Sequence, residues 1–311
     1  MSLSMPSMSR VCLRLAPIIG ALVAAVVLVG CSAVRLGYNT GPTLAYWWLD
    51  SYFDFDGTQS LRIRDDLQTT LDWHRKEELP LLIQTLKDLQ TMAPKPVTPE
   101  QVCQLVTVLQ TRVHVAMDHF VPSIAAVAPT LTAAQVKHVS KEFDSRNQKW
   151  REEWLEGTVA ERADRRVKQI VDRAEAFYGP LEPLQLGIVR SHIAASTFDG
   201  PRQYREMERR HQDALKVLTD LRTTKVSPAA ANEAIRGLLE RTLKAPDPQY
   251  RQYIDHLTSD SCAAMAALHN SSTAEQRAKL VRTLQDYEGD ARALASQQSV
   301  AAPDKPSAKN F

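Results

Sequence analysis

Apolar residues recur at intervals of three and four along most of the chain, which is the spacing of amphipathic helices. This spacing predicts a helix over residues 57–92, kinked or broken at Pro80, and a second over 98–120, followed by a turn with one short helix in 121–130. Further helices are expected over residues 132–156, 158–178, 182–196, 201–223, 228–243, 247–269 and 273–297. No convincing strand pattern is found. We therefore expect an all-α protein of nine or ten helices, arranged as an antiparallel bundle or an elongated helical array.

Four of the expected helices begin with similar residues: Thr98 to Gln101, Thr132 to Gln135, Glu182 to Gln185, and Thr273 to Gln276. Such a pair is a capping box, in which each side chain binds the backbone N–H of the other residue. The full form, Leu131-Thr-x-x-Gln135, also resembles the LTxxQ motif of the Spy/CpxP family of all-α periplasmic chaperones. That resemblance implies binding of unfolded envelope proteins, whereas capping alone implies nothing about function. Both interpretations stay open.

The N-terminal thirty residues have the pattern of a secretory signal. Arg10 and Arg14 precede an unbroken apolar run over residues 17–29, which is short for a membrane span of about 20 residues. The run leads to Leu-Val-Gly-Cys at Cys31, which resembles the lipobox of bacterial lipoproteins. The resemblance implies cleavage before Cys31 and acylation of its thiol and its new amine, which gives stable anchoring. Ser32 then implies the outer membrane, with the protein facing the periplasm of a two-membrane cell. The alternative is an uncleaved helix with an incidental cysteine.

The chain therefore divides into a signal peptide (1–30), a lipidated tether (31–41), an all-α periplasmic domain (42–297) and a polar tail (298–311) that we expect to be disordered. The domain has possible subdomains at 42–130 and 131–297. Removing residues 1–30 takes away two arginines and no acidic residue, so 38 basic residues become 36, equal to the 36 acidic ones. A neutral envelope protein is a poor candidate for nucleic-acid binding.

Known catalytic and phosphate-binding motifs are missing, and the chain has only 11 glycines with which to build a phosphate loop. His114 and Asp118 share one helix face but lack a third metal ligand nearby. We therefore expect no cofactor and no metal. Cys103 and Cys262 would lie in an oxidising compartment, where they either form a disulfide or remain as two buried thiols.

Two tryptophans, Trp150 and Trp154, lie four residues apart and should share one helix face. Together with Arg146, Lys149 and Arg151 they could form an aromatic and cationic strip that binds extended partners. The alternative is a solvated helix in which the two tryptophans are buried anchors.

Aromatic residues are crowded into residues 44–60, where Tyr46, Leu49 and Phe53 should share one helix face. Three interpretations are open for this stretch. It could be a core helix, it could rest at the membrane interface that tryptophan and tyrosine favour, or it could line a ligand groove. The core interpretation is preferred because three aspartates count against contact with anionic headgroups. Asp50, Asp54 and Asp56 also provide the acidic residues that an envelope hydrolase would need.

The N-terminal part of the mature chain contains the elements Y-N, W-W-L-D and W-H-R-x-x-E-L-P. The matching residues are Tyr38, Asn39, Trp47, Trp48, Leu49, Asp50, Gln59, Trp73, His74, Arg75, Glu78, Leu79 and Pro80. In these residues the chain resembles a family of bacterial lipoproteins known only as a domain of unknown function. The resemblance implies envelope localisation and a helical architecture, and it implies no activity.

The function that fits these observations is non-enzymatic binding by a lipid-anchored envelope protein with a chaperone-like or adaptor role. Its partners would be the membrane, through the anchor, and other envelope proteins. An envelope hydrolase and a purely structural spacer are the alternatives.

Overall fold

The computed structural model describes residues 33–297, and all regular structure in this range is helical. A first helix covers residues 33–53 of the described range. Ten α-helices follow it: α2 Gly57–Trp73, α3 Leu79–Met92, α4 Pro99–Val127, α5 Ala133–Trp154, α6 Val159–Tyr178, α7 Pro183–Ala195, α8 Gly200–Thr223, α9 Pro228–Leu243, α10 Pro248–Asn270 and α11 Ala274–Ala295. A short π-helix, η1 (His74–Glu78), joins α2 to α3, and a 3-10 turn, η2 (Ala128–Thr130), follows α4. The expected all-α fold is confirmed.

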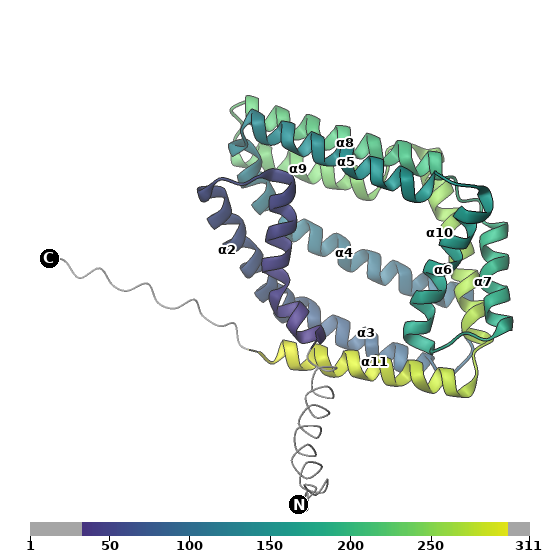
Figure 1. The fold of residues 1–311 in the computed structure, drawn as a ribbon. Helices are drawn as coiled ribbons and strands as arrows, with labels where there is room; N and C mark the ends of the chain where they lie inside the picture. The colour runs from purple at the N-terminus through teal and green to yellow at the C-terminus, as the bar shows by residue number, and fades with distance from the viewer. Residues whose placement is uncertain (1–32, 298–311) are drawn as a thin grey trace, which may run out of the picture.

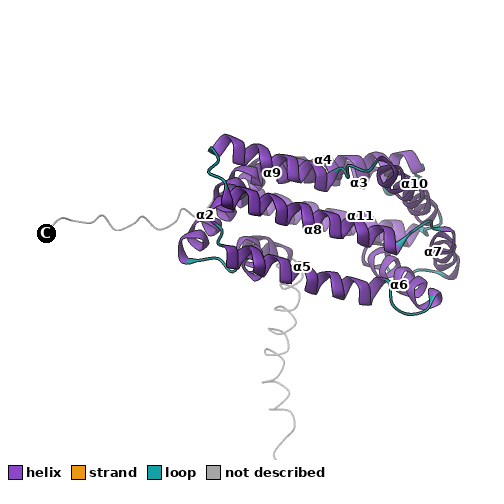
Figure 2. Ribbon diagram, turned by 90° about the horizontal axis from the view of Figure 1, so that it is seen from above, coloured by secondary structure: helices purple, strands orange, loops and turns teal. Residues whose placement is uncertain are grey.

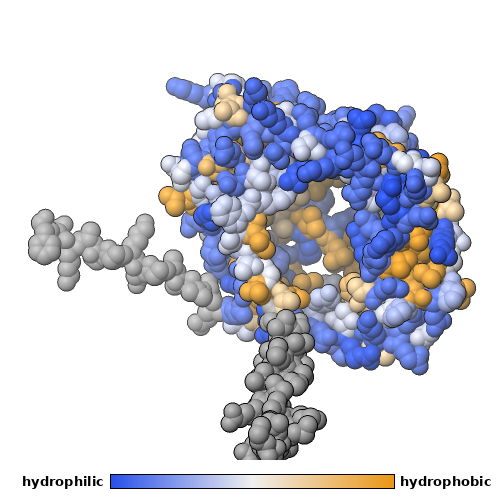
Figure 3. Space-filling model, in the orientation of Figure 1, coloured by the Kyte–Doolittle hydropathy of each residue, from blue (hydrophilic) through white to orange (hydrophobic). Residues whose placement is uncertain are grey.

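The helices form a frame (Figure 1), and the space-filling view shows a hollow at its centre (Figure 3). In this view α5, α8 and α9 form the upper side, α6, α7 and α10 the right side, and α3 and α11 the lower side. The first helix and α2 close the left side. Helix α4 runs across the back, and the view from above places α4 and α9 on the face opposite α5 (Figure 2). The arrangement is therefore an open frame crossed by one helix.

The hydrophobic core is divided among the sides and corners of this frame. The largest cluster joins the first helix, α2, α4, α5, α8 and α9, and includes Tyr46, Val121, Val139 and Ile235. A second cluster lies between α3 and α11, and a third between α6, α7 and α10. The largest cluster contains residues from both sides of position 130. Residues 42–130 and 131–297 therefore share a core, because α4 and α2 pack directly against the helices that follow.

The helix starts follow the local sequence. All four expected capping boxes form, at Thr98, Thr132, Glu182 and Thr273, each with the glutamine three residues later. Asp56 and Gln59 make a fifth box at the start of α2. Each box satisfies two backbone N–H groups that a helix start otherwise leaves unpaired. This explains why the expected starts are close to the observed ones.

Two segments differ from expectation. The turn expected in 121–130 is mostly helix, because α4 continues through Pro122 to Val127. Proline removes one helical hydrogen bond there, but the burial of Val121, Ala125 and Val127 offsets that cost. Residues 33–41, expected as part of a tether, belong to the first helix, which is fixed to the body by side-chain contacts described below.

The expected signal peptide (1–30), the expected lipidation site Cys31 and the C-terminal residues 298–311 lie outside the described residues. Between residues 33 and 297, every helix is too short or too polar to cross a bilayer.

Candidate binding site in the central opening

Helix α4 is apolar, yet its central part is not buried. Its buried residues all lie between Val121 and Val127, close to its C-terminal end. The preceding turns expose Val108 (41%), Leu109 (45%) and Val113 (50%). Figure 3 shows hydrophobic surface at the back of the opening, where Figure 1 places α4. A solvated helix normally carries polar residues on its exposed face, whereas here about half of each of these apolar side chains is left uncovered by the described chain.

The N-terminal end of α4 is tied covalently to α10. Cys103 and Cys262 form a disulfide with their Cα atoms 5.5 Å apart, which is the first of the two alternatives that the sequence left open. Just before α4, the backbone N–H of Val97 donates to Asn270 Oδ1 at 2.8 Å, and Asn270 Nδ2 donates to Val97 O at 2.9 Å. These contacts fix one end of α4 to the right side of the frame.

The W-H-R-x-x-E-L-P element grips the middle of α4. The ring of Trp73 stacks on that of His119, with centroids 4.0 Å apart. Arg112 Nη1 lies 3.5 Å from Glu78 Oε1, and Glu78 is only 7% exposed. Glu78 is the last residue of the π-helix η1 and lies two positions before Pro80. The element therefore holds α4 on the side of α2 without covering the exposed apolar residues.

The same element also holds the first helix. The hydroxyl of Tyr38 lies 2.8 Å from His74 Nδ1, and Arg75 Nη2 donates to Asn39 Oδ1 at 2.6 Å. Burial raises the pKa of Tyr38 to about 12 and lowers the pKa of His74 from its usual range. Both groups are therefore neutral near pH 7. These motif residues have structural partners, and they position two helices of the frame.

The tryptophans expected to share a face do so at the corner where the upper and right sides meet. The ring centroids of Trp150 and Trp154 are 6.5 Å apart, and Trp150 stacks on Tyr204 of α8 at 5.9 Å. Arg151 lies over Tyr204 at 5.7 Å, and Lys149 is exposed. Arg146 points elsewhere, over Tyr52 of the first helix at 4.2 Å. The expected strip therefore keeps its aromatic centre and Arg151, and loses Arg146.

A shallow recess of about 350 Å³ opens beside these tryptophans. Its lining comes from α5, α6, α7, α8 and α10 and includes Trp150, Trp154, Ile170, His192, Phe198 and Ser261. Burial, followed by the positive charge of Arg166, lowers the pKa of His192. Ser261 precedes the disulfide residue Cys262, so the recess and the N-terminal half of α4 adjoin the same part of α10. An apolar side chain bound at this corner would have aromatic surface on several sides.

Residues 51–251 match the model of a family of unknown function, DUF6279. The chain belongs to the DUF6279 family. The expected membership of a family without an assigned function is thereby confirmed, and the matched range contains Trp73–Pro80, α4 and the tryptophan corner. No curated protein and no solved structure matches the chain. Membership of DUF6279 supplies no activity, so the function has to be argued from the geometry.

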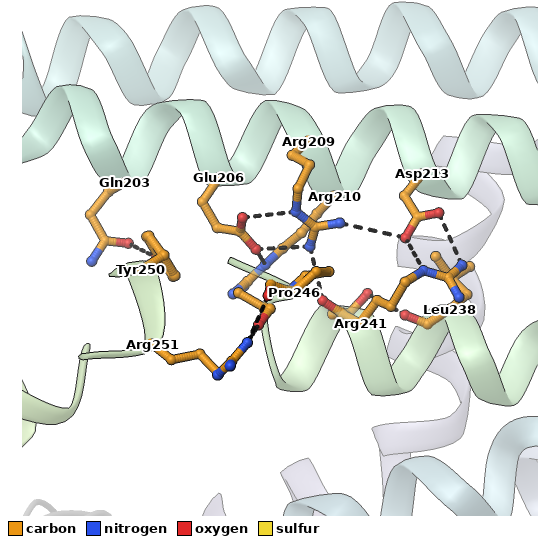
Figure 4. Close-up of polar contacts among 12 residues, drawn as sticks. Gln203, Glu206, Arg209, Arg210, Asp213, Leu238, Arg241, Pro246, Tyr250 and Arg251 are labelled. Atoms are coloured by element: carbon orange, nitrogen blue, oxygen red, sulfur yellow. Dashed lines mark hydrogen bonds and ion pairs between the residues drawn. The ribbon is translucent and has the colours of Figure 1, made fainter. Parts of the chain in front are cut away.

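A polar network stiffens the DUF6279 frame next to the tryptophan corner (Figure 4). Glu206, which is 6% exposed, accepts hydrogen bonds at 2.8 Å from both Arg209 and Arg210. Asp213 binds Arg241 of α9 through two contacts of 2.8 and 3.0 Å. Burial opposes the charge of Glu206, but the two arginines outweigh it and lower its pKa. Arg209 Nη2 also donates to Arg241 O at 2.9 Å, so the network combines contacts within α8 with contacts that join α8 to α9.

Two pairs of buried glutamines, which sequence reasoning missed, clamp helix starts together. Gln135 Nε2 donates to Gln59 Oε1 at 2.6 Å, and Gln185 Nε2 donates to Gln276 Oε1 at 2.6 Å. Each of these glutamines also completes its own capping box. The repeated Gln at the third helical position was the available signal, but a box by itself does not reveal that its glutamine is buried.

The aromatic stretch over 44–60 is split between core and surface. Tyr46 is buried at 4%, and Phe53 and Phe55 pack on the same cluster. Trp47 and Trp48 are 59% and 55% exposed, so the core interpretation is wrong for both tryptophans. The reason is geometric: only the face of the first helix that carries Tyr46 meets the body.

The three aspartates of this stretch serve local structure. Asp50 Oδ1 accepts from the backbone of Phe55 at 3.0 Å, and Asp56 caps α2. Asp54 adopts a left-handed φ of 48°, and its carbonyl accepts from Gln135. Between residues 33 and 297, no group of three or more metal-ligating side chains comes together, and this range includes His114 and Asp118.

Proposed function

We propose that this DUF6279 protein is a lipid-anchored envelope protein that binds other polypeptides in its central opening and catalyses no reaction. The location rests on the sequence around Cys31, which resembles a lipobox and would place the mature chain on the periplasmic side of the outer membrane. The binding role rests on the shape of the frame and on the surface of α4.

The observation that carries the binding role is the exposed apolar centre of α4. Val108, Leu109 and Val113 are each about half exposed on a helix whose two ends are firmly attached. Contact with a partner would remove this apolar surface from water, and the favourable free energy is about 25 cal/mol per Å². Because the frame holds α4 in place, the surface is preformed, and binding loses little free energy to the ordering of this helix.

The surroundings favour a polypeptide partner with apolar side chains. The recess beside Trp150 and Trp154 offers aromatic walls for such a side chain. Arg151 and Lys149 stand at the exposed edge of the same helix, where they can meet carboxylates of the partner. Extended or unfolded envelope proteins present both kinds of group together, which suits a chaperone-like or adaptor role.

The test is suppression of aggregation of a chemically denatured client protein by the purified protein at equal molar ratio. We expect the wild type to slow aggregation, and Leu109→Gln with Val113→Gln to weaken client binding by roughly tenfold, since two half-buried apolar contacts are lost. The matched control is Leu184→Gln with Leu61→Gln, which changes two apolar residues at sites that are 69% and 74% exposed on other helices. Equal activity of the two double variants, or no activity of the wild type, would refute binding at α4.

The anchor is tested separately. Replacement Cys31→Ser should leave an unprocessed precursor of larger mass. If the mass and the membrane fractionation stay unchanged, Cys31 is not the lipidated residue.

A further inference from the structure

The first helix carries an apolar stripe on the face that points away from the body. Four large side chains form this outer stripe: Leu36 (64% exposed), Leu44 (60%), Trp47 (59%) and Trp48 (55%). At about 100° per residue, the four positions fall within about 120° of the helix circumference, so they share one broad side of the helix. From Leu36 to Trp48 the stripe is about 18 Å long, at 1.5 Å per residue.

The outer stripe lies on a surface without charge. None of the residues exposed between positions 33 and 51 is charged. The two partly buried charged residues of this segment are used elsewhere, since Arg35 pairs with Asp290 and Asp50 accepts from the backbone of Phe55. The exposed face of α5, by contrast, includes Lys137, Lys141, Asp144, Lys149, Glu152 and Glu153. A solvent-facing helix of this protein is thus normally highly charged, and the first helix is not.

The opposite face of the first helix is fixed to the body, so the outer stripe cannot turn inward. Tyr46 is buried, and its hydroxyl lies 2.9 Å from Ser60 Oγ. Tyr38 and Asn39 bind the W-H-R element. The guanidinium of Arg64, an exposed residue of α2, lies over the ring of Tyr46 at 3.4 Å and is 5.4 Å from the ring centroid of Trp47. The edge of the stripe therefore has a cation that can meet an anionic headgroup.

We propose that the outer stripe of the first helix rests in the headgroup region of the lipid bilayer. Tryptophan favours this region because its ring is apolar while its N–H can still bond to polar groups. The helix is described from residue 33, two positions after Cys31, so a lipid at Cys31 would place it against the bilayer. A second copy of the chain would bury the same surface, but only a bilayer is brought there by the anchor. For its location the inference rests on the proposed lipidation, and it is independent of client binding at α4.

Docking along this stripe would set the orientation of the frame. The face of the first helix that carries Leu44, Trp47 and Trp48 would lie toward the membrane, and the rest of the frame would extend from it into the periplasm.

The test uses the full-length protein, purified with its lipid and reconstituted into vesicles of phosphatidylethanolamine and phosphatidylglycerol. The acyl chains are either plain or brominated near the carbonyl end, and tryptophan emission is measured. Bromine should quench at most the part of the emission that comes from Trp47 and Trp48, which are two of the 5 tryptophans. This quenching should vanish in Trp47→Tyr with Trp48→Tyr. It should weaken strongly in Leu36→Glu with Leu44→Glu, but not in the control Leu184→Glu, an exposed leucine across the frame.

Each outcome decides the proposal. Vesicle-bound wild-type protein with equal emission in plain and brominated lipid would overturn the docking of the stripe while leaving the anchor intact. A dimer by mass whose tryptophans are shielded from bromine would assign the stripe to a second copy. Failure of the protein to float with vesicles would overturn both the anchor and the stripe. None of these results changes the aggregation assay for α4.

Discussion

Loss of the disulfide between Cys103 and Cys262 should lower the stability of this protein substantially. The two residues are 159 positions apart, and their bond joins α4 to α10. In the chain-entropy treatment, opening a loop of this length raises the conformational entropy of the unfolded chain by about 17 cal/mol/K, which corresponds to about 5 kcal/mol at 25 °C. Measured values generally fall below this limit because the reduced chain keeps some residual structure. We therefore expect a loss of about 3–5 kcal/mol in the free energy of unfolding.

The assay is urea unfolding followed by far-ultraviolet circular dichroism, with and without dithiothreitol. The reductant should lower the urea midpoint of the wild type and raise the slope, since the reduced unfolded chain exposes more surface. Replacement Cys103→Ala with Cys262→Ala should match the reduced wild type and should not respond to the reductant. If the wild-type midpoint is the same under both conditions, the bond does not constrain the unfolded chain and the entropic reasoning fails.

Three further predictions concern the buried polar groups. Gln185→Leu should lower the free energy of unfolding in urea by about 1–3 kcal/mol, because it leaves the buried Gln276 without its partner. Gln101→Leu, at an exposed capping box, should lower it by less than about 1 kcal/mol. Glu206→Gln should lower the free energy of unfolding by about 1–3 kcal/mol. Asp220→Asn, which breaks an exposed ion pair of the same i,i+4 spacing, should lower it by at most about 0.5 kcal/mol. Equal losses in the two variants would contradict the role of burial. Burial lowers the pKa of His74, so the folded state binds fewer protons than the unfolded state. The contribution of His74 to stability should therefore be complete above the usual histidine pKa and should decline as the pH falls below it. His74→Gln should reduce that decline in melting curves recorded between about pH 5 and pH 8.

The helix starts were predictable because the signals for them are local. A threonine and a glutamine three positions apart bind each other's backbone whatever the rest of the chain does, and this placed the starts of α4, α5 and α11 correctly. Pro122 was misleading for the opposite reason. Its local effect favours a break, but the helix continues because Val121 and Ala125 are buried against segments that lie far away in the sequence.

The tryptophan corner was predictable only in part. Spacing placed Trp150 and Trp154 on one face, since helical periodicity is a property of the segment itself. Tyr204, the ring partner of Trp150, lies 54 residues further along the chain, and Arg146 turns to Tyr52, 94 residues before it. Such pairings depend on how α5 is held between α8 and the first helix, which no local pattern encodes. The same limit explains why Trp47 and Trp48 were assigned to the core.

Antiparallel helices usually pack into a bundle with a filled core, whereas the helices of this protein surround an opening. A closed bundle would cover Val108, Leu109 and Val113 and gain about 1 kcal/mol for each half-exposed side chain. The frame lacks this stabilisation, and α4 is instead held across the opening by the disulfide, by the buried Glu78 and by the stacked ring of Trp73. Departures from good packing concentrate where a protein binds or acts. The buried half of each side chain contributes a similar amount to the fold, so Leu109→Gln with Val113→Gln should lower the free energy of unfolding by no more than about 2 kcal/mol. A large loss of stability in this variant would instead make α4 part of the core and remove the basis for a binding site there.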